Sequence, residues 1–432
     1  MERKIERFLS NWKESPNRMP LILSGARQVG KTYAALTFGK TYYKNVVYFN
    51  MEDSAEVTAI FDRDLQPERI VRELSAKCGQ SIFPGDTLII FDEIQACERA
   101  LTSLKYFCEN APEYHVIAAG SLLGVALNRE KYSFPVGKVD MATLYPLDFE
   151  EFLWATGNRA FCEMIRESYE SFTPLSLHET ALELYRTYLV VGGMPRAVLE
   201  YTQTHDFNFV VAAQKSLNDA YIADMAKYAT AQETTRIMAA WASVPAQLAK
   251  ENHKFQYKVI KSGARAYEYE TPLDWLKSAG IIHKCFLAKQ GKMPLSAYAD
   301  NTAFKVYMMD TGLLCSKFDI APTVVLNSPH SFDGFKGALA ENYIMQALVA
   351  AGISPYYWAS EGKAEVDFVF QDRQGNVIPL ECKSAEHVRS KSLGVFVSRY
   401  KPPYAIRVSA RNFGFEGGIK SIPLYALFCV KE

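Results

Sequence analysis

The sequence lacks the features that mark several large classes of protein. Lys plus Arg equals Asp plus Glu at 48 each, so its 432 residues carry a formal net charge of zero. That balance excludes a uniformly basic nucleic-acid coat, although not a local basic patch. The longest apolar runs, such as residues 88–91, are far too short to span a bilayer, so we expect no membrane partner. Residues 1–7 carry charges of both signs and no apolar core follows, which predicts no signal peptide and a cytoplasmic location.

Cysteine and histidine are present but are not spaced for metal binding. The eight cysteines form no CxxC pair, and none clusters with histidine at zinc-finger spacing. The seven histidines include no HExxH motif. We therefore expect reduced thiols and structural histidines.

Composition and pattern instead indicate a globular chain of about three domains. Hydrophobic residues make up 49% and charged residues 22%, which are ordinary globular values. Residues 1–155 alternate helical stretches with near-continuous apolar runs, as expected for parallel strands buried on both faces. We predict an α/β domain there. Its strands are expected at 21–23, 46–49, 88–91 and 116–119.

The rest of the chain divides into three predicted regions. Residues 156–235 look mostly helical and would connect the domains. Residues 236–325 place helices before a short β-like stretch, which is the pattern of a winged helix. Residues 330–432 return to mixed α/β, and 320–334 is the expected linker.

Within the predicted winged helix, two helices and one strand are expected. Residues 237–249 form the first helix. The second covers 271–280, with Pro272 at its first position and Gly280 at its end. The β-like stretch follows at 281–287.

A complete phosphate-binding motif, GxxxxGK[ST], lies between the first strand and the next helix. Glycines let the backbone wrap close to phosphate, and free N–H groups at a helix N-terminus attract its charge. Lys31 is expected to reach the β- and γ-phosphates of ATP, and Thr32 to offer its hydroxyl to Mg²⁺. The predicted loop comprises Gly25, Ala26, Arg27, Gln28, Val29, Gly30, Lys31 and Thr32.

A second motif follows sixty residues later, where the strand at 88–91 ends in two carboxylates. Asp92 would hold Mg²⁺ through water, and Glu93 would polarise the attacking water. Ser121 ends the next strand, where it would sense the γ-phosphate or cap the following helix. These two roles of Ser121 are compatible.

These motifs and the element LYPLDFEEF at 144–152 resemble the bacterial and archaeal AAA-type ATPases that carry a C-terminal domain of unknown function. Further signatures at 188–195, 305–314, 335–337 and 367–383 agree, so the resemblance covers nearly the whole chain. In that family an Arg commonly follows the glycine before the PL-F-EF element.

Here Lys138 follows that glycine, Gly137. Lys cannot make the planar bidentate contact of Arg with phosphate, which argues against an arginine-finger role at this position. Arg129 and Arg196 are the other candidates for a trans or sensor arginine, with a surface salt bridge as the alternative for each.

A second constellation lies near the C-terminus. Asp367, Glu381 and Lys383 follow the spacing of the PD-(D/E)xK nucleases, on a predicted hairpin of strands 365–370 and 377–383. In such sites two carboxylates hold Mg²⁺, which polarises a phosphodiester, and the Lys orients water.

Glu341 would add a further acid from the inward face of a helix over 338–350, where a carboxylate needs a metal, a cation or a hydrogen-bond donor. The alternative is a structural salt bridge of Lys383 with Asp367 or Glu381 in a degenerate domain.

Two segments have a local excess of positive charge. Residues 386–411 contain several Lys and Arg but one acidic residue, Glu386. Residues 250–265 likewise contain one acidic residue, Glu251. Either segment could contact DNA, the first through a phosphate backbone and the second as part of the winged helix. The alternatives are a solvated basic face and a protein-docking module.

The sequence therefore predicts an AAA-type P-loop ATPase joined through helices and a winged helix to a PD-(D/E)xK-like domain. ATP and Mg²⁺ would be its cofactors, and its nucleotide state would control DNA binding or cleavage by the C-terminal half. The main alternative is a nucleotide switch that grips a partner protein, with an inert C-terminal fold. A third reading is a chaperone-like motor, which requires a homo-oligomeric ring.

Overall fold

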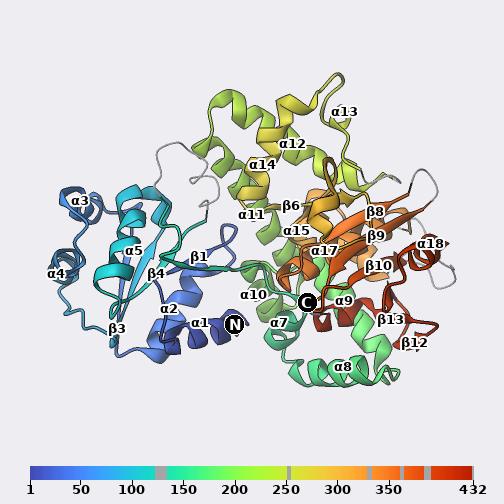
Figure 1. The fold of residues 1–432 in the computed structure, drawn as a ribbon, viewed down its shortest axis with the longest axis horizontal. Coiled ribbons are helices and arrows are strands. Elements are labelled where there is room, and N and C mark those ends of the chain that lie inside the picture. Colours follow the sequence, from blue (N-terminus) through green and yellow to red (C-terminus); the bar gives the residue numbers. More distant parts are fainter. Residues whose placement is uncertain (122–133, 251–253, 328–332, 361–363, 384–390, 431–432) are drawn as a thin grey trace. The chain divides into compact units, whose positions relative to one another are not determined.

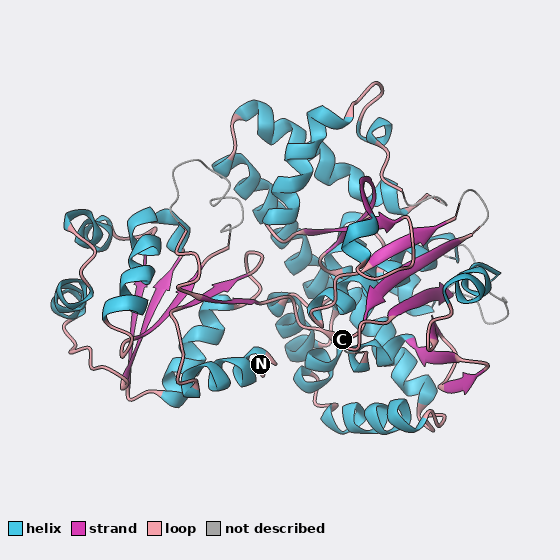
Figure 2. Cartoon of the chain, in the orientation of Figure 1, coloured by secondary structure: helices cyan, strands magenta, loops and turns pink. Residues whose placement is uncertain are grey.

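The computed structural model describes residues 1–432 except 122–133, 251–253, 328–332, 361–363, 384–390 and 431–432 (Figure 1). The chain forms two compact units. One unit is Met1–Tyr145 with Ser278–Gly280, and the other is Pro146–Lys277 with Ile281–Glu432. Both units mix helices and strands (Figure 2). Within these described ranges, no helix combines the length and the apolar character needed to cross a bilayer.

The first unit is built on a parallel sheet in the order β2-β3-β4-β1-β5. The four expected apolar runs are strands β1 to β4. Strand β5 was not predicted, because this edge strand alternates half-buried and exposed residues instead of forming an apolar run. The strands are β1 (Leu21–Ser24), β2 (Asn45–Asn50), β3 (Thr87–Asp92), β4 (His115–Ala119) and β5 (Asp140–Thr143).

Helices cover both faces of this sheet, which explains the continuous apolar runs of its strands. Ile89 and Phe91 belong to a core shared with α3, α4 and α5, and the Phe91 ring packs edge-on against Phe61 at 5.6 Å. On the other face, Leu88 of β3 meets Gly39 of α2. The helices of the unit are α1 (Ile5–Glu14), α2 (Lys31–Tyr42), α3 (Ala55–Arg63), α4 (Pro67–Cys78) and α5 (Glu98–Asn110).

The second unit begins with helices, as expected for residues 156–235. A capping box of Thr230 and Glu233 starts α12 several residues before the predicted start at 237. These helices are α7 (Phe149–Ala155), α8 (Arg159–Ser171), α9 (His178–Val191), α10 (Pro195–Thr204), α11 (Phe207–Tyr228) and α12 (Ala231–Leu248).

An eight-stranded mixed sheet follows, in the order β12-β13-β11-β10-β9-β8-β6-β7. The helix α17 contacts β7 and β10, and α18 contacts β9 and β10. The strands are β6 (Ile282–Ala288), β7 (Ala299–Met308), β8 (Tyr356–Ala359), β9 (Glu365–Gln371), β10 (Val377–Lys383), β11 (Ala405–Ser409), β12 (Gly414–Glu416) and β13 (Ile419–Pro423). The remaining helices are α13 (Tyr257–Ile260), α14 (Ala266–Ser278), α15 (Thr311–Lys317), α16 (Pro322–Asn327), α17 (Asp333–Ala350) and α18 (Lys391–Tyr400).

The strand expected at 281–287 is present as β6, but its surroundings differ from those of a separate winged helix. β6 pairs with β7 on one side and with β8 on the other, so it belongs to the same sheet as the C-terminal strands. A two-stranded ribbon alone would leave an edge of unpaired N–H and C=O groups, and this sheet pairs the β6 edge instead.

Two further predictions about this region were wrong. The helix α14 begins at Ala266, and Pro272 lies inside it instead of at its start. Tyr269 and Leu273 are buried on both sides of the proline, so packing compensates for the hydrogen bond that Pro272 removes. The expected linker contains the helix α16, which buries Val325.

Asp310 ties together two of the segments that carried the family resemblance. Its buried carboxylate accepts hydrogen bonds from the backbone N–H of Gly193 at 2.6 Å and of Leu313 at 2.9 Å. Burial raises the pKa of Asp310 to about 6, and these hydrogen bonds oppose that rise. The signatures at 188–195 and 305–314 therefore meet around one buried acid.

Gly193 offers a direct test of this close packing. A Cβ at this position would lie 1.9 Å from the backbone oxygen of Leu147, so Gly193→Ala should lower the free energy of unfolding by roughly 2–3 kcal/mol. Gly394→Ala is the control, because Gly394 is exposed in α18 with nothing near its Cβ position, and it should stabilise by up to about 1 kcal/mol. Equal denaturant midpoints for the two variants would contradict this packing.

Candidate functional site

The phosphate-binding loop lies between β1 and α2, as its motif predicts. Gln28 (φ 63°) and Gly30 (φ 97°) adopt left-handed backbone conformations, which turn the chain into the helix. A Cβ on Gly25 would lie 2.2 Å from the oxygen of Leu144, so only glycine fits there. Val29 is buried, and its carbonyl accepts a hydrogen bond from Arg3 at 3.0 Å.

Lys31 is buried and engaged by the loop itself. Its Nζ donates to the carbonyls of Gly25 at 3.0 Å and Ala26 at 2.8 Å, and to Ser121 Oγ at 3.1 Å. Burial lowers the pKa of Lys31 to about 8, Glu93 and Asp92 oppose that shift, and Arg27 adds to it. The structure thus brings Lys31 and Ser121 together. The capping role of Ser121 concerns residues 122–133, which lie outside the described residues.

Asp92 receives three hydrogen bonds that fix its carboxylate. Thr32 Oγ1 donates to Asp92 Oδ2 at 2.7 Å, which joins the two predicted motifs directly. Tyr48 donates to the same oxygen at 2.8 Å, and the N–H of Glu93 donates to Oδ1 at 3.0 Å. Burial and the bond to Asp92 raise the pKa of Tyr48, so its hydroxyl remains a donor. Sequence reasoning missed Tyr48. Its one signal was a hydroxyl group within the apolar run of β2, the strand next to β3.

Glu93 follows β3 in a left-handed conformation, with φ of 48°, that is uncommon for a residue with a Cβ. The buried side chain of Gln95 donates to Glu93 Oε2 at 2.5 Å. Strained backbone of this kind persists where the surroundings over-determine it, and it clusters at functional sites. Gln95 was also missed, although it lies two residues beyond the motif.

Two of the arginine-finger positions have partners among the described residues. Lys138 forms an ion pair with Glu109 at 3.0 Å, and Arg196 donates to Ser216 Oγ at 3.2 Å. Arg129 lies outside the described residues.

The predicted C-terminal constellation is also brought together in space. Asp367 on β9 and Glu381 and Lys383 on β10 share the predicted antiparallel hairpin, and Glu341 lies on α17. Lys383 Nζ is 2.7 Å from Glu381 Oε1, and Asp367 Oδ2 accepts the N–H of Cys382 at 2.8 Å. Burial raises the pKa of Asp367, and the charges of Glu341 and Glu381 raise it further.

Sequence reasoning missed a second lysine of this cluster, Lys305. Lys305 on β7 is 1% exposed, and its Nζ lies 2.6 Å from Glu365 Oε1 and 3.9 Å from Glu341 Oε2. Tyr307, two residues along the strand, donates to Glu341 Oε2 at 3.0 Å. The sequence signal was a lysine within an otherwise apolar strand.

The predicted Mg²⁺ ligands Glu341, Asp367 and Glu381 lie in this cluster. Over the part of the chain that the structure describes, no three His, Cys, Asp or Glu side chains are placed to hold one ion. Likewise no disulfide joins any of the eight cysteines.

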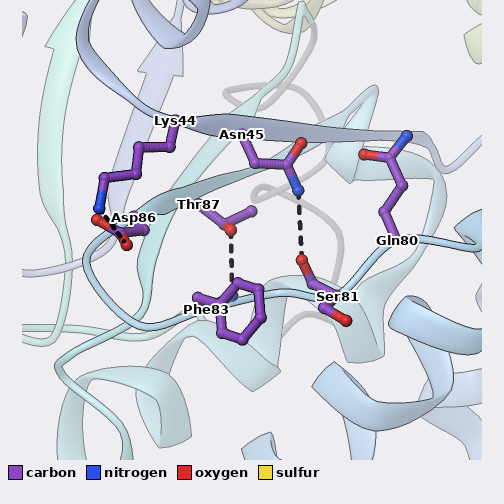
Figure 3. Close-up of a pocket in the computed structure, with 7 residues that line it drawn as sticks. All are labelled: Lys44, Asn45, Gln80, Ser81, Phe83, Asp86 and Thr87. Atoms are coloured by element: carbon purple, nitrogen blue, oxygen red, sulfur yellow. Dashed lines mark hydrogen bonds and ion pairs between the residues drawn. The ribbon is translucent and has the colours of Figure 1, made fainter.

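A surface pocket of about 530 Å³ lies at the amino ends of β2 and β3, away from the loop edge of the sheet (Figure 3). Its polar groups engage one another. Lys44 pairs with Asp86 at 2.9 Å, and Asn45 donates to the oxygen of Ser81 at 3.3 Å. Ligands of open α/β sheets bind at the carboxyl ends of the strands, so this pocket is not the candidate nucleotide site.

Several solved structures match this chain at low similarity. The Walker-type ATPase of Pyrococcus abyssi is 15% identical with a TM-score of 0.46, over 73% of this chain and 95% of that one. The ORC1 protein of Aeropyrum pernix in complex with DNA is 12% identical with a TM-score of 0.31, over 79% and 91%. AMPPCP-bound DnaA from Aquifex aeolicus is 15% identical with a TM-score of 0.30, over 64% and 88%.

No curated protein matches the chain. Family matches cover three successive segments. Residues 182–323 match a domain of unknown function, DUF8612, and residues 336–427 match another, DUF4143. Residues 17–153 match the AAA domain. The N-terminal segment therefore carries an AAA domain, and the chain continues into two domains of unknown function.

Proposed function

We propose that the first unit binds ATP with Mg²⁺ and hydrolyses it. The observation that carries this proposal is the convergence of Lys31, Thr32, Asp92 and Ser121, which come from three different strand ends and meet through hydrogen bonds. Strands β1, β3 and β4 present these residues at one edge of the sheet, where the strand order changes direction and where ligands of such sheets bind.

The residues of the site have separate roles in this proposal. The N-terminus of α2 and the loop N–H groups bind the phosphates, and Lys31 exchanges its carbonyl partners for phosphate oxygens. Thr32 and Asp92 would hold Mg²⁺, which neutralises charge on the phosphates. Glu93 accepts the proton of the attacking water, and Gln95 orients the Glu93 carboxylate.

Two substitutions separate binding from hydrolysis. Lys31→Ala should weaken ATP binding at least roughly tenfold, because charge-assisted hydrogen bonds to phosphate are lost. Glu93→Gln should keep binding and lower turnover by roughly 10²–10⁴-fold. Calorimetry with ATP or GTP in magnesium buffer and a phosphate-release assay measure both effects. Lys44→Ala, in the pocket at the opposite strand ends, should behave as the parent, and a parent that takes up neither nucleotide would refute the proposal.

The pKa of Lys31 predicts proton uptake on binding. With a pKa of about 8 in the free protein, Lys31 is mostly neutral at pH 8.5, and a triphosphate favours its charged form. ATP binding should therefore take up a proton at pH 8.5 and not at pH 7, and affinity should fall by up to about tenfold per pH unit above pH 8.

Calorimetry at pH 8.5 in two buffers of different ionisation enthalpy measures this uptake. The exposed Lys40 of α2 provides the control variant, Lys40→Ala, which should keep it. A heat that does not depend on the buffer would contradict the assignment of the low pKa to Lys31.

We further propose that nucleotide state in the first unit controls the second. Two outputs are compatible with the acidic cluster, which comprises Glu341, Glu365, Asp367 and Glu381. The first is binding or cleavage of DNA, and the second is binding of a partner protein. The grouping of Asp367, Glu381 and Lys383 supports the nuclease-like output, whereas the ion pair of Lys383 with Glu381 supports the inert one. Parts of both basic segments lie outside the described residues.

Substitution at the cluster decides between the two outputs. If the fold cleaves DNA, the parent should cut duplex or branched DNA with Mg²⁺ or Mn²⁺, and Asp367→Ala should abolish cutting. Arg373→Ala, in the exposed turn between β9 and β10, is the matched control. A parent that binds DNA without cutting it supports regulated binding, and a parent that does neither supports the protein switch.

A further inference from the structure

The acidic cluster of the second unit contains its own positive charge. Buried carboxylates are costly unless a metal, a cation or a hydrogen-bond donor compensates them. In the PD-(D/E)xK pattern a divalent ion would supply that charge. Here Lys305 Nζ lies 2.6 Å from Glu365 and 3.9 Å from Glu341, and Lys383 lies 2.7 Å from Glu381.

Lys305 is fixed in this position by the sheet. Its backbone pairs with Cys285 in the middle of the β6–β7 ladder, and the flanking Phe304 and Val306 are buried. Its Nζ lies 5.1 Å from the centre of the Tyr357 ring, which adds a favourable cation–π contact. At 1% exposure the ammonium has no route to solvent without leaving these partners.

The charged state of Lys305 follows from the same neighbours. Burial alone would lower the pKa of Lys305, but the charges of Glu341, Glu365 and Asp367 more than offset that effect and raise it above the ordinary value. The ion pairs with Glu365 and Glu341 therefore make Lys305 the buried cation of this cluster.

Protein donors also occupy one oxygen of each predicted metal ligand. Tyr307 donates to Glu341 Oε2, the N–H of Cys382 donates to Asp367 Oδ2, and Lys383 pairs with Glu381 Oε1. This agrees with the finding that the described chain places no three acidic, His or Cys side chains around one ion. The residues present therefore do not fit the divalent ion that the spacing motif implies.

We propose that Lys305 is a permanent counter-cation that takes the place of a divalent metal in this cluster. Lys305 then supplies positive charge to Glu365 and Glu341 without a metal, and the cluster holds α17 and β9 in place instead of cleaving phosphodiesters. The inference depends on the second unit alone, so it stands whether or not the first unit hydrolyses ATP.

The first test uses Mn²⁺ alone as the probe, on the full chain without nucleotide. An Asp92→Asn background removes the metal ligand proposed for the first unit. Electron paramagnetic resonance of free Mn²⁺ and calorimetry should then find no binding that depends on Asp367. Binding that is present with Lys305 intact and lost on Asp367→Asn would overturn the proposal.

The second test removes the charge of Lys305 and asks whether Mn²⁺ can replace it. Lys305→Met keeps the length of the side chain but leaves the carboxylates unbalanced, so the melting temperature should fall by roughly 10 °C. Mn²⁺ at millimolar concentration should restore roughly half of that loss, while the parent shows no shift.

A double variant keeps this test decisive even where Lys305→Met does not fold. Lys305→Met combined with Glu341→Gln removes one charge of each sign and should fold without metal, with no Mn²⁺ effect. ATP binding by this double variant should match the parent, which separates failure here from failure of the proposed ATPase. A metal-induced shift in the parent as large as in Lys305→Met would refute the substitution of lysine for metal.

Discussion

The hydrogen bond between Thr32 and Asp92 is the contact on which the first unit's chemistry depends. It joins the start of α2 to the end of β3, two points sixty residues apart in sequence. Burial places the end of β3, because its apolar residues 88–91 are buried and Asp92 follows them as a buried carboxylate. The hydrophobic effect thereby positions two polar atoms 2.7 Å apart, at the edge of the sheet where the loop of residues 25–32 also lies.

The buried lysines Lys31 and Lys305 are compensated by different kinds of partner. In the first unit the partners of Lys31 are neutral, namely two carbonyls and a hydroxyl. Hydrogen bonds from its ammonium to an anionic polyphosphate would be stronger than these. In the second unit Lys305 already has the carboxylates of Glu365 and Glu341 beside it. The proposed nucleotide site would gain its compensating charge from an anionic ligand, whereas Lys305 has acidic partners within the protein.

The sequence could predict those features that depend on local pattern. Apolar runs located β1 to β4, the glycines located the loop, and the acids after residue 91 located Asp92 and Glu93. It could also place Asp367 and Glu381 on one hairpin. It could not find Tyr48 or Lys305, because each acts through contacts between strands or with a helix that no fixed spacing encodes. For the same reason β6 was predicted as part of a winged helix, since the pairing of a strand edge depends on residues far apart in the sequence. Gln95 is local, two residues from its partner Glu93, but nothing in the motif distinguishes it from an ordinary polar residue.

The central claim is that the loop at residues 25–32 binds a nucleoside triphosphate. A crystal structure with a non-hydrolysable ATP analogue and Mn²⁺ tests it most directly. The account predicts that Lys31 Nζ leaves the carbonyls of Gly25 and Ala26 for the terminal phosphates, while metal density lies beside Thr32 and Asp92 and none lies beside Lys305. An analogue bound elsewhere, with Lys31 still on the loop carbonyls, would contradict it.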